Sequence, residues 1–306
     1  MLYKYVQKNL TWIDLECPTR DEVHQIINDW NVNPIVAQEL VGPTLRSKVE
    51  VYPDFIYLVL HFPIMRRRGS KHQDTQQEVD FIIGRNFIIT SRYDNLDSIH
   101  EFSKLFEVNS ILDKSNMSEH GGMLFFYMIR SIYDSLLSEF EGLNDSIHKV
   151  EEKIFKGEER AMVVRISEIS RDLLDAKRAM RLHREILESF DVASRRFFGE
   201  EFFHQAKAIT GEFYKAHNAL ESNLDSIMEL RETNNSMLNT KQNEIMKIFT
   251  ILAFVTFPLS LAIEIVTIPS TSNPLFDHPQ TFWIIITGTV LSCLIMFSFF
   301  KYKKWL

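Results

Sequence analysis

The chain has 306 residues, of which 34 are Lys or Arg and 41 are Asp or Glu, so its formal net charge is -7 at pH 7. This acidic balance excludes a general nucleic-acid-binding protein, whose binding surface would be basic. Two cysteines, Cys17 and Cys293, are too few for a disulfide framework or a cysteine-based zinc cluster, and the length is enough for two domains or more.

Residues 1–110 are predicted to form a cytoplasmic α/β domain. Five of the nine prolines lie in the first 63 residues, and the next is Pro258, so the composition changes after this part. Thr19 and Glu22 have the spacing of a capping box that opens a helix. Strands are predicted over residues 11–16, 55–62 and 79–90, with a hairpin turn at 83–86 instead of a glycine-rich phosphate loop.

Residues 111–247 are predicted to form a helical region. Apolar residues recur there every three or four positions, as in a coiled-coil seam: Ile132, Leu136, Phe140, Leu143, Ile147, Val150 and Ile154. Gly157 breaks this pattern, and a second helix is predicted over residues 165–190. Neither Gly nor Pro occurs between Gly211 and Pro258, so one stalk helix of 46 residues, about 69 Å long, is predicted to run into a membrane.

Two apolar segments near the C-terminal end predict a membrane hairpin. Residues 282–300 form a run of 19 residues without a charge, which is long enough to cross a hydrocarbon core of about 30 Å. Residues 248–268 form the other span and contain one charge, Glu264. An outer loop over residues 269–281 joins the spans, and residues 301–306 form a basic tail.

The basic residues predict the orientation of this hairpin. They flank the two spans and are absent from the loop between them: Lys241, Lys247, Lys301, Lys303 and Lys304. By the positive-inside rule, both ends of the chain face the cytoplasm, which predicts a multi-pass protein of the cell (inner) membrane. No signal peptide is expected in residues 1–16, where charges interrupt every short apolar stretch. A buried globular helix pair is the alternative, but it would not explain the charge asymmetry.

Winding the first span as an ideal helix gathers its polar residues on one face. At 100° per residue, seven residues fall within an arc of about 80°: Met246, Phe249, Ala253, Phe257, Ser260, Glu264 and Thr267. The opposite face is apolar and suits lipid or the second span. Because two spans cannot enclose a polar channel, we hypothesise a pore shared by several copies of the chain.

Glu264 has two interpretations. In the functional one, a ring of these carboxylates binds cations near the outer mouth of the pore, which makes Glu264 the candidate metal site. In the plainer one, Glu264 lies near the outer end of the span and reaches the lipid headgroups. Asp277, beside His278 in the outer loop, is a further candidate, although such a pair is more often solvated turn chemistry.

No arrangement of serine, cysteine or histidine indicates nucleophilic catalysis, so no enzyme activity is assigned. No resident cofactor is expected either. The expected partners are membrane lipid, divalent cations and further copies of the chain, and no nucleic acid.

Several segments resemble the CorA family of divalent metal ion transporters in the family's order. They are WIDLECPT, RSKVEVYPDFIYLVLHF, VDFIIGRNFIIT, YMIRSIYDSLLSEFEGLNDSIHKVEEKIF, NEIMKIFTILAFVTFPLSLA and the terminal FFKYKKWL. The resemblance implies an α+β membrane protein: a homopentamer with a cytoplasmic α/β/α funnel, a long stalk helix and a two-helix transmembrane hairpin. It implies passive uptake of hydrated Mg²⁺, with Co²⁺, Ni²⁺ or Zn²⁺ as other substrates. Asn243 matches the family's pore-entrance asparagine, and Met246, Phe249, Ala253, Phe257 and Ser260 match its pore-lining positions.

The chain departs from the family at the selectivity motif. Thr267, Ile268 and Pro269 stand where the family has Gly-Met-Asn. This difference predicts altered selectivity, with Glu264 offering charge in place of amide and carbonyl dipoles. It also leaves two alternatives open: a non-conducting membrane scaffold or sensor with the same architecture, and a proton-coupled zinc transporter in which Glu264 carries the proton.

A second departure concerns regulation. The family's Mg²⁺-regulated members have acidic residues in a cytoplasmic hairpin, where residues 66–71 of this chain read Arg-Arg-Arg-Gly-Ser-Lys. We therefore hypothesise that Mg²⁺ at that interface does not set the closed-open equilibrium. The arginines of this hairpin would pair instead with stalk acids such as Glu200, Glu201 or Glu212, and the alternative is that the hairpin is only a solvated turn.

Overall fold

The computed structural model describes residues 1–44, 46–64, 75–93, 97–112, 120–268 and 280–303. The chain divides into two compact units, Met1–Arg231 and Glu232–Leu306, which are considered separately. The basic hairpin at 66–71, Pro269 and Asp277 lie outside the described residues.

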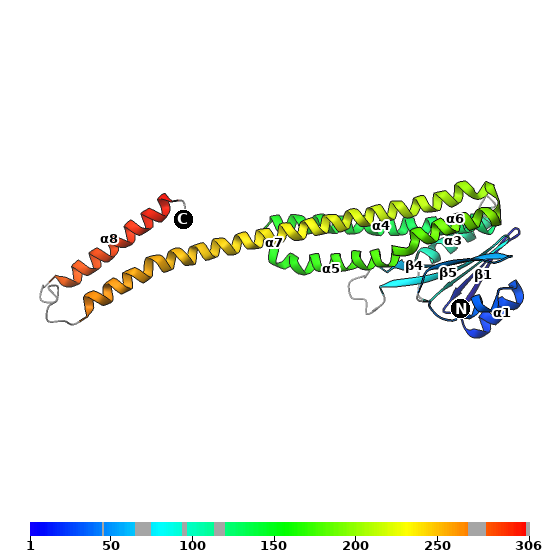
Figure 1. The fold of residues 1–306 in the computed structure, drawn as a ribbon, viewed down its shortest axis with the longest axis horizontal. Helices are drawn as coiled ribbons and strands as arrows, with labels where there is room; N and C mark the ends of the chain where they lie inside the picture. The colour runs from blue at the N-terminus through cyan, green and yellow to red at the C-terminus, as the bar shows by residue number, and fades with distance from the viewer. Residues whose placement is uncertain (45, 65–74, 94–96, 113–119, 269–279, 304–306) are drawn as a thin grey trace. The chain divides into compact units, whose positions relative to one another are not determined.

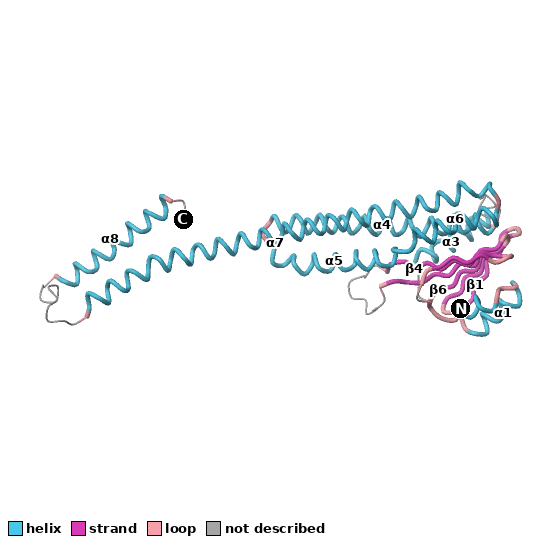
Figure 2. Tube along the Cα trace, in the orientation of Figure 1, coloured by secondary structure: helices cyan, strands magenta, loops and turns pink. Residues whose placement is uncertain are grey.

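The first unit is built on a mixed six-stranded sheet (Figures 1 and 2). Its strands are β1 (Leu2–Gln7), β2 (Leu10–Glu16), β3 (Lys48–Val51), β4 (Phe55–Pro63), β5 (Gln76–Gly84) and β6 (Phe87–Arg92). Their order across the sheet is β1-β2-β6-β5-β4-β3, and only β2 and β6 pair in parallel. The strands predicted over residues 11–16, 55–62 and 79–90 are confirmed, and the last of these is the β5–β6 hairpin.

Helices cover both faces of the sheet (Figure 1). On one face, α1 (Arg20–Trp30) and α2 (Pro34–Glu39) bury an apolar cluster against the strands. The predicted capping box opens α1, since the Glu22 amide donates to Thr19 Oγ1 at 3.3 Å and the Thr19 amide donates to Glu22 Oε2 at 2.8 Å. On the other face lie longer helices, and Phe125 from one of them contacts Phe81 of β5 edge-to-face at 5.2 Å between ring centroids.

These longer helices are α3 (Asp97–Leu112), α4 (Gly121–Phe155), α5 (Glu159–Ala179) and α6 (His183–Phe198). The predicted seam is confirmed on α4, where Ile132, Phe140 and Ile154 are buried. Gly157, with φ of 95°, follows the end of α4 as expected. The helix predicted over 165–190 is instead two helices, because a 3₁₀ turn at Met180–Leu182 separates α5 from α6.

The helix α7 (Phe203–Thr267) has 65 residues and is longer than the predicted 46. Neither Gly211 nor Pro258 ends it. A proline inside a membrane-spanning helix is tolerated because neighbouring groups can satisfy the freed backbone carbonyl. Together with α8 (Thr281–Tyr302), α7 supplies the two helical segments that are long and apolar enough to cross a membrane.

His183 joins the helix layer to the sheet at the start of α6. Its side chain is fully buried, and its Nε2 donates to the carbonyl oxygen of His61 on β4 at 2.8 Å. Since Nε2 carries the proton, Nδ1 accepts from the Tyr133 hydroxyl of α4, also at 2.8 Å. Burial lowers the pKa of His183 to about 4, so the ring is neutral at pH 7.

This buried ring predicts a loss of stability in mild acid. Between pH 7 and pH 4 the unfolded chain protonates His183 and the folded chain does not, so folding loses about 3 kcal/mol from this residue. Urea unfolding of the detergent-solubilised protein at several pH values, followed by near-ultraviolet circular dichroism, measures how the free energy of unfolding changes with pH. The slope of that dependence is the quantity compared between variants. His183→Gln is expected to flatten it and His148→Gln, at an exposed site, to leave it unchanged. Equal slopes in all three proteins would contradict this account.

Gly121 sets α4 against the β5–β6 turn. Its amide donates to the Arg85 carbonyl oxygen at 2.8 Å, and a Cβ at this position would overlap the carbonyl oxygens of Gly84 and Phe87. Gly142, further along α4, has no atom within 4 Å of an added Cβ. The two glycines therefore differ in what surrounds them, although both lie in one helix.

Substituting each glycine by alanine is expected to change the free energy of unfolding in opposite directions. Gly121→Ala is expected to lower the free energy of unfolding by about 2 kcal/mol, because backbone atoms must move. Gly142→Ala is expected to raise it by about 0.5–1 kcal/mol through the better helix propensity of alanine. Urea midpoints of the two variants give the comparison, and a Gly121→Ala midpoint equal to or above that of the unsubstituted protein would show that the contact at Gly121 is not tight.

Candidate functional site

One side of α7 packs against α8 in the second unit. On α7 the less exposed residues are Ile251, Val255 and Leu259, spaced by four residues, with Ile251 only 7% exposed, and we refer to them as the contact row. The facing row on α8 contains its less exposed residues: Ile285, Thr289, Cys293, Met296 and Phe300. A crevice of about 230 Å³ lies between the helices beside Leu259 and Gly288.

The predicted stripe lies on the other side of α7. Its members are exposed in the single chain, and the exposed fraction reaches 74% at Phe257. On an ideal helix the centre of the contact row is about 160° from the centre of the stripe. Of the apolar face, which was expected to suit lipid or the second span, Ile251, Val255 and Leu259 are the less exposed residues, while Ile248 and Leu252 are exposed. Asn243, one turn before the stripe, is exposed too.

The hydroxyl groups of the stripe are bonded to their own helix. Ser260 Oγ donates to the Thr256 carbonyl oxygen at 3.0 Å, and Thr267 Oγ1 donates to the Ile263 carbonyl oxygen at 3.0 Å. Each hydroxyl therefore presents oxygen lone pairs outward, which suits a cation or its hydration water. Such bonding also makes a hydroxyl tolerable against lipid, so these residues alone do not require a wet surface.

Glu264 is the residue of the stripe that most needs contact with water or a cation. Its exposed carboxylate lies one turn before α7 ends at Thr267, where the last carbonyl groups of the helix carry partial negative charge. The helix end therefore offers this carboxylate no favourable partner. An ionised carboxylate costs roughly 3 kcal/mol at the centre of a spanning helix and less near its end, unless it meets water or a cation. Ile268 follows the helix and is exposed.

A single copy of the chain does not build a metal site here. In the part of the chain that the structure describes, no group of three or more His, Cys, Asp or Glu residues is placed to hold a metal ion. A cation at Glu264 would therefore need equivalent residues from other copies. Asp277, the other metal candidate, lies outside the described residues.

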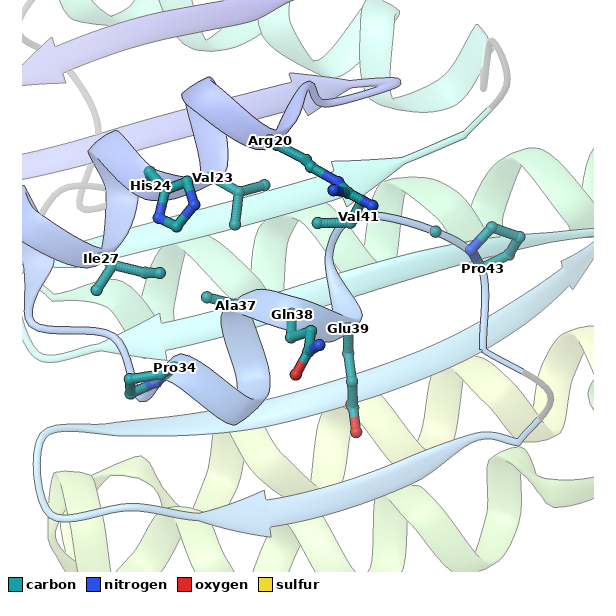
Figure 3. Close-up of a pocket in the computed structure, with 11 residues that line it drawn as sticks. Arg20, Val23, His24, Ile27, Pro34, Ala37, Gln38, Glu39, Val41 and Pro43 are labelled. Carbon is teal, nitrogen blue, oxygen red and sulfur yellow. The ribbon is translucent and has the colours of Figure 1, made fainter.

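Two polar regions of the first unit were not found from the sequence. The pocket in Figure 3 lies between α1 and α2 and has a volume of about 690 Å³. Arg20 and His24 line it, together with Glu39, whose carboxylate is paired with Lys48 at 2.8 Å.

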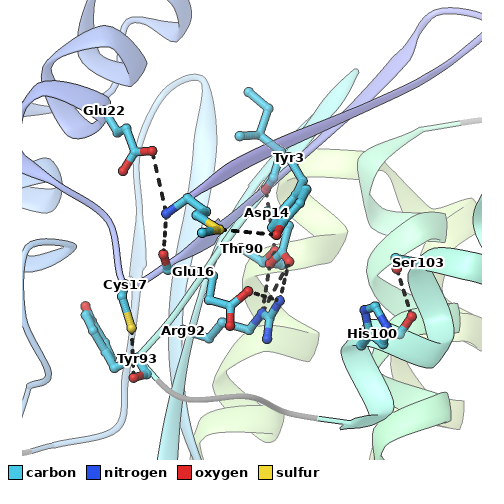
Figure 4. Close-up of polar contacts among 12 residues, drawn as sticks. Tyr3, Asp14, Glu16, Cys17, Glu22, Thr90, Arg92, Tyr93, His100 and Ser103 are labelled. Carbon is cyan, nitrogen blue, oxygen red and sulfur yellow. Dashed lines mark hydrogen bonds and ion pairs between the residues drawn. The ribbon is translucent and has the colours of Figure 1, made fainter.

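The other is the ion pair in Figure 4, where Arg92 Nη2 contacts Asp14 Oδ2 at 3.0 Å and Glu16 Oε2 at 3.2 Å. Both Arg92 and Asp14 are buried, and Thr90 Oγ1 donates to Asp14 Oδ1 at 2.7 Å. This cluster joins β2 to β6, with the Arg92 guanidinium shared between two carboxylates of β2, and we assign it a structural role.

The structure describes the acidic residues that were expected to pair with the basic hairpin, but not the hairpin itself. Glu212 contacts Lys215 at 2.8 Å and Arg130 at 3.7 Å, so its charge is already matched. Glu200 and Glu201 are exposed. Pairing with the basic hairpin stays a prediction, since residues 66–71 lie outside the described part of the chain.

Comparisons with known proteins agree with this architecture. The cobalt/magnesium transport protein CorA of Thermotoga maritima is 21% identical over 301 residues, covering 97% of this chain and 83% of that protein. The complete structure of the CorA magnesium transporter from Methanocaldococcus jannaschii has a TM-score of 0.83 at 18% identity and covers 99% of this chain and 93% of that one. The full-length CmaX protein gives a TM-score of 0.74 at 15% identity, covering 95% and 88%. These structural matches establish the fold expected from the resemblance.

The family match covers both units. The family described as "CorA-like Mg2+ transporter protein" matches residues 7–303, which include the sheet, the helical layer and both apolar helices. It is a family of transporters, which agrees with the absence of an assigned enzyme activity. The chain belongs to the family of CorA-like Mg²⁺ transporter proteins.

Proposed function

We propose that the chain moves divalent cations, with Mg²⁺ as the main substrate, through a pore at the centre of a homopentamer. Co²⁺, Ni²⁺ and Zn²⁺ are the other candidate ions. The observation that carries this proposal is the exposed face of α7 with Glu264, opposite the face that packs on α8. The relatives named for cobalt and magnesium transport support the choice of ions. Both termini are proposed to lie in the cytoplasm.

The position of α8 orients the helices in such an assembly. Because α8 covers one side of α7, a ring of copies can place the stripes toward a common axis and α8 toward lipid. The inner part of the stripe then contributes apolar rings at Met246, Phe249 and Phe257, which can close a pore by excluding water. The outer part contributes oxygen atoms from Ser260, Glu264 and Thr267.

The chemistry of this outer end favours hard cations. Carboxylate and hydroxyl oxygens are ligands that Mg²⁺ accepts, whereas softer metals prefer nitrogen or sulfur. A carboxylate ring attracts any divalent ion, so we propose stronger capture and lower discrimination than an amide ring would give. Thr267, Ile268 and Pro269 replace the Gly-Met-Asn motif at this end, and this difference underlies the proposed change in selectivity.

A non-conducting scaffold or sensor is the second candidate function. It is favoured by that same replacement, because the residues that bind the hydrated cation elsewhere in the family are missing. A proton-coupled zinc transporter would use Glu264 as its proton carrier. The three functions differ in ion flux and in its dependence on a pH gradient.

Flux measurements separate these functions. Purified protein in liposomes is expected to take up Mg²⁺ and Co²⁺, with Ni²⁺ and Zn²⁺ also moving, and without need of a pH gradient, because an electrostatic ring discriminates little among divalent ions. Ion-sensitive dyes inside the liposomes report the rates. Absence of flux for every ion would support the scaffold, and Zn²⁺ flux that needs a pH gradient would support proton coupling.

The role of Glu264 is tested by removing its charge. Glu264→Gln is expected to reduce Mg²⁺ uptake at low Mg²⁺ concentration by about tenfold, equivalent to about 1.4 kcal/mol, with the largest effect at low ionic strength. Glu244→Gln is the matched control, since Glu244 is exposed on the opposite side of the same helix. Uptake that is the same in both variants would mean that Glu264 only reaches the headgroups.

A further inference from the structure

A histidine and a glutamate on neighbouring strands hold the backbone of Thr44, between α2 and β3. His61 of β4 and Glu78 of β5 are opposite each other in the sheet, and His61 Nε2 lies 3.0 Å from Glu78 Oε2. The Thr44 amide donates to Glu78 Oε2 at 2.7 Å, and the Thr44 carbonyl oxygen lies 3.1 Å from His61 Nε2. The two side chains therefore bind both backbone polar groups of one residue.

The charge of His61 is part of this contact. Its Nδ1 lies 2.9 Å from Ser47 Oγ, so both ring nitrogens have partners that accept hydrogen bonds, as the doubly protonated ring requires. The hydrogen bond to Glu78 raises the pKa of His61 above its ordinary value, against the opposing effect of burial. The side chains of His61 and Glu78 are only 9% and 2% exposed. The imidazolium therefore balances a buried carboxylate.

The same sheet contains a second buried ion pair, which keeps its charge at every pH the protein meets. Arg92 pairs with Asp14, and a guanidinium is not deprotonated in proteins. Arg92 lies opposite Val79, which points away from the face of Glu78. His61 has an ordinary pKa of about 6.5, so its charge changes near neutral pH. The pair of His61 and Glu78 is thus conditional on pH, and the pair on the other face is not.

Two further carboxyl groups lie on the face of Glu78. Asp80 is fully buried two residues further along β5, and burial together with the charge of Glu78 raises its pKa, which favours its neutral form. Glu39 of α2 is paired with Lys48 at 2.8 Å, and Lys48 also contacts Glu50 of β3 at 2.9 Å. The ammonium group of Lys48 is therefore shared by two other carboxylates.

Other titratable or charged groups surround this pair. The hydroxyls of Tyr57 and Tyr93 contact Asp80, at 3.5 and 3.1 Å. Four further basic groups lie on adjoining elements, and each is either exposed or neutral: Arg20, His24, Arg46 and His183. Residues 65–74, which connect β4 to β5, lie outside the described residues. Within the described part of the chain, His61 is the cation in contact with Glu78.

We propose that His61 and Glu78 form a pH-sensitive clamp on the backbone of Thr44, which is closed while the imidazole ring is protonated and opens when that proton is lost. The neutral ring can keep a hydrogen bond to Glu78, but a bond between charged partners is roughly twice as strong. Loss of the proton also leaves a buried carboxylate without its counter-charge, which is strongly destabilising. The inference is independent of the proposed function.

The clamp adjoins the pocket in Figure 3. Gly42 and Pro43 line that pocket and directly precede Thr44 in the chain. Opening of the clamp frees this part of the pocket wall, so the shape of the pocket depends on whether His61 is protonated. The first unit thereby responds to the pH of the solution around it.

The direction of the pH dependence follows from the tighter binding of a proton by the closed clamp. When the clamp opens, His61 meets water and its pKa returns toward about 6.5. The stabilisation is therefore complete below about pH 6.5 and is lost as the pH rises through the higher pKa of the closed form. Loss of one proton raises the equilibrium constant for opening by at most about tenfold per pH unit. The effect of His183 has the opposite sign, because its stabilisation is lost as the pH falls.

Hydrogen exchange at the Thr44 amide tests the clamp in the full-length protein in detergent. Mass spectrometry with residue-level fragmentation gives the exchange rate between about pH 6 and pH 8.5, and each rate is divided by the intrinsic rate at that pH. The corrected rate is expected to rise by at least about threefold over this range, because opening is coupled to loss of the His61 proton.

Three variants assign that proton. His61→Gln keeps a hydrogen-bond donor without the charge, so its corrected rate is expected to be high and independent of pH. His24→Gln, at an exposed site on α1, is the matched control and is expected to behave as the unsubstituted protein. Asp80→Asn imitates the neutral carboxyl group and is expected to keep the pH dependence.

A corrected rate that stays constant with pH in the unsubstituted protein would overturn the inference, whether or not the variants fold. A pH dependence that persists in His61→Gln, or that disappears in Asp80→Asn, would assign the proton to another group and would overturn it too. Ion flux plays no part in the measurement. Failure of the proposed function would therefore leave this result unchanged.

Discussion

The packing of α8 on one side of α7 is the interaction on which the functional interpretation depends. Ile251, Val255 and Leu259 are the residues shielded on that side, which leaves the opposite side of the helix exposed. The side left over contains the polar and acidic residues of the span. Had α8 covered Ser260 and Glu264 instead, the exposed face would be apolar throughout and suited only to lipid.

Much of the fold was predictable because its signals lie within short stretches of the sequence. Alternating or continuous apolar runs identified β2, β4, β5 and β6, and the Thr19–Glu22 spacing identified the start of α1. The break at Met180–Leu182 was not predictable, since no glycine or proline marks it and the bond from His183 to the His61 carbonyl joins residues 122 apart. The continuation of the helix through Pro258 was predicted with the span 248–268, whereas its start at Phe203 was missed because Gly211 was taken as the boundary.

The candidate site was predicted in part for the same reasons. Helical winding alone separated the stripe from the apolar face, because the position of each side chain around a regular helix follows from its place in the sequence. Which residues α8 covers could not be read from the sequence, since Ile248 and Leu252 have the same character as Ile251 and stay exposed.

Pro258 gives the first span a property that a regular helix lacks. Proline has no N–H, so the carbonyl oxygen of Phe254 loses its usual partner four residues ahead. Among the described residues, the nearby hydroxyls of Thr256 and Ser260 bond to other carbonyls, those of Leu252, Thr256 and Phe257. Because that bond is already missing, bending α7 at this level would cost less than bending it elsewhere, and in the proposed pore a small change in curvature beside Phe257 would widen or narrow an apolar constriction.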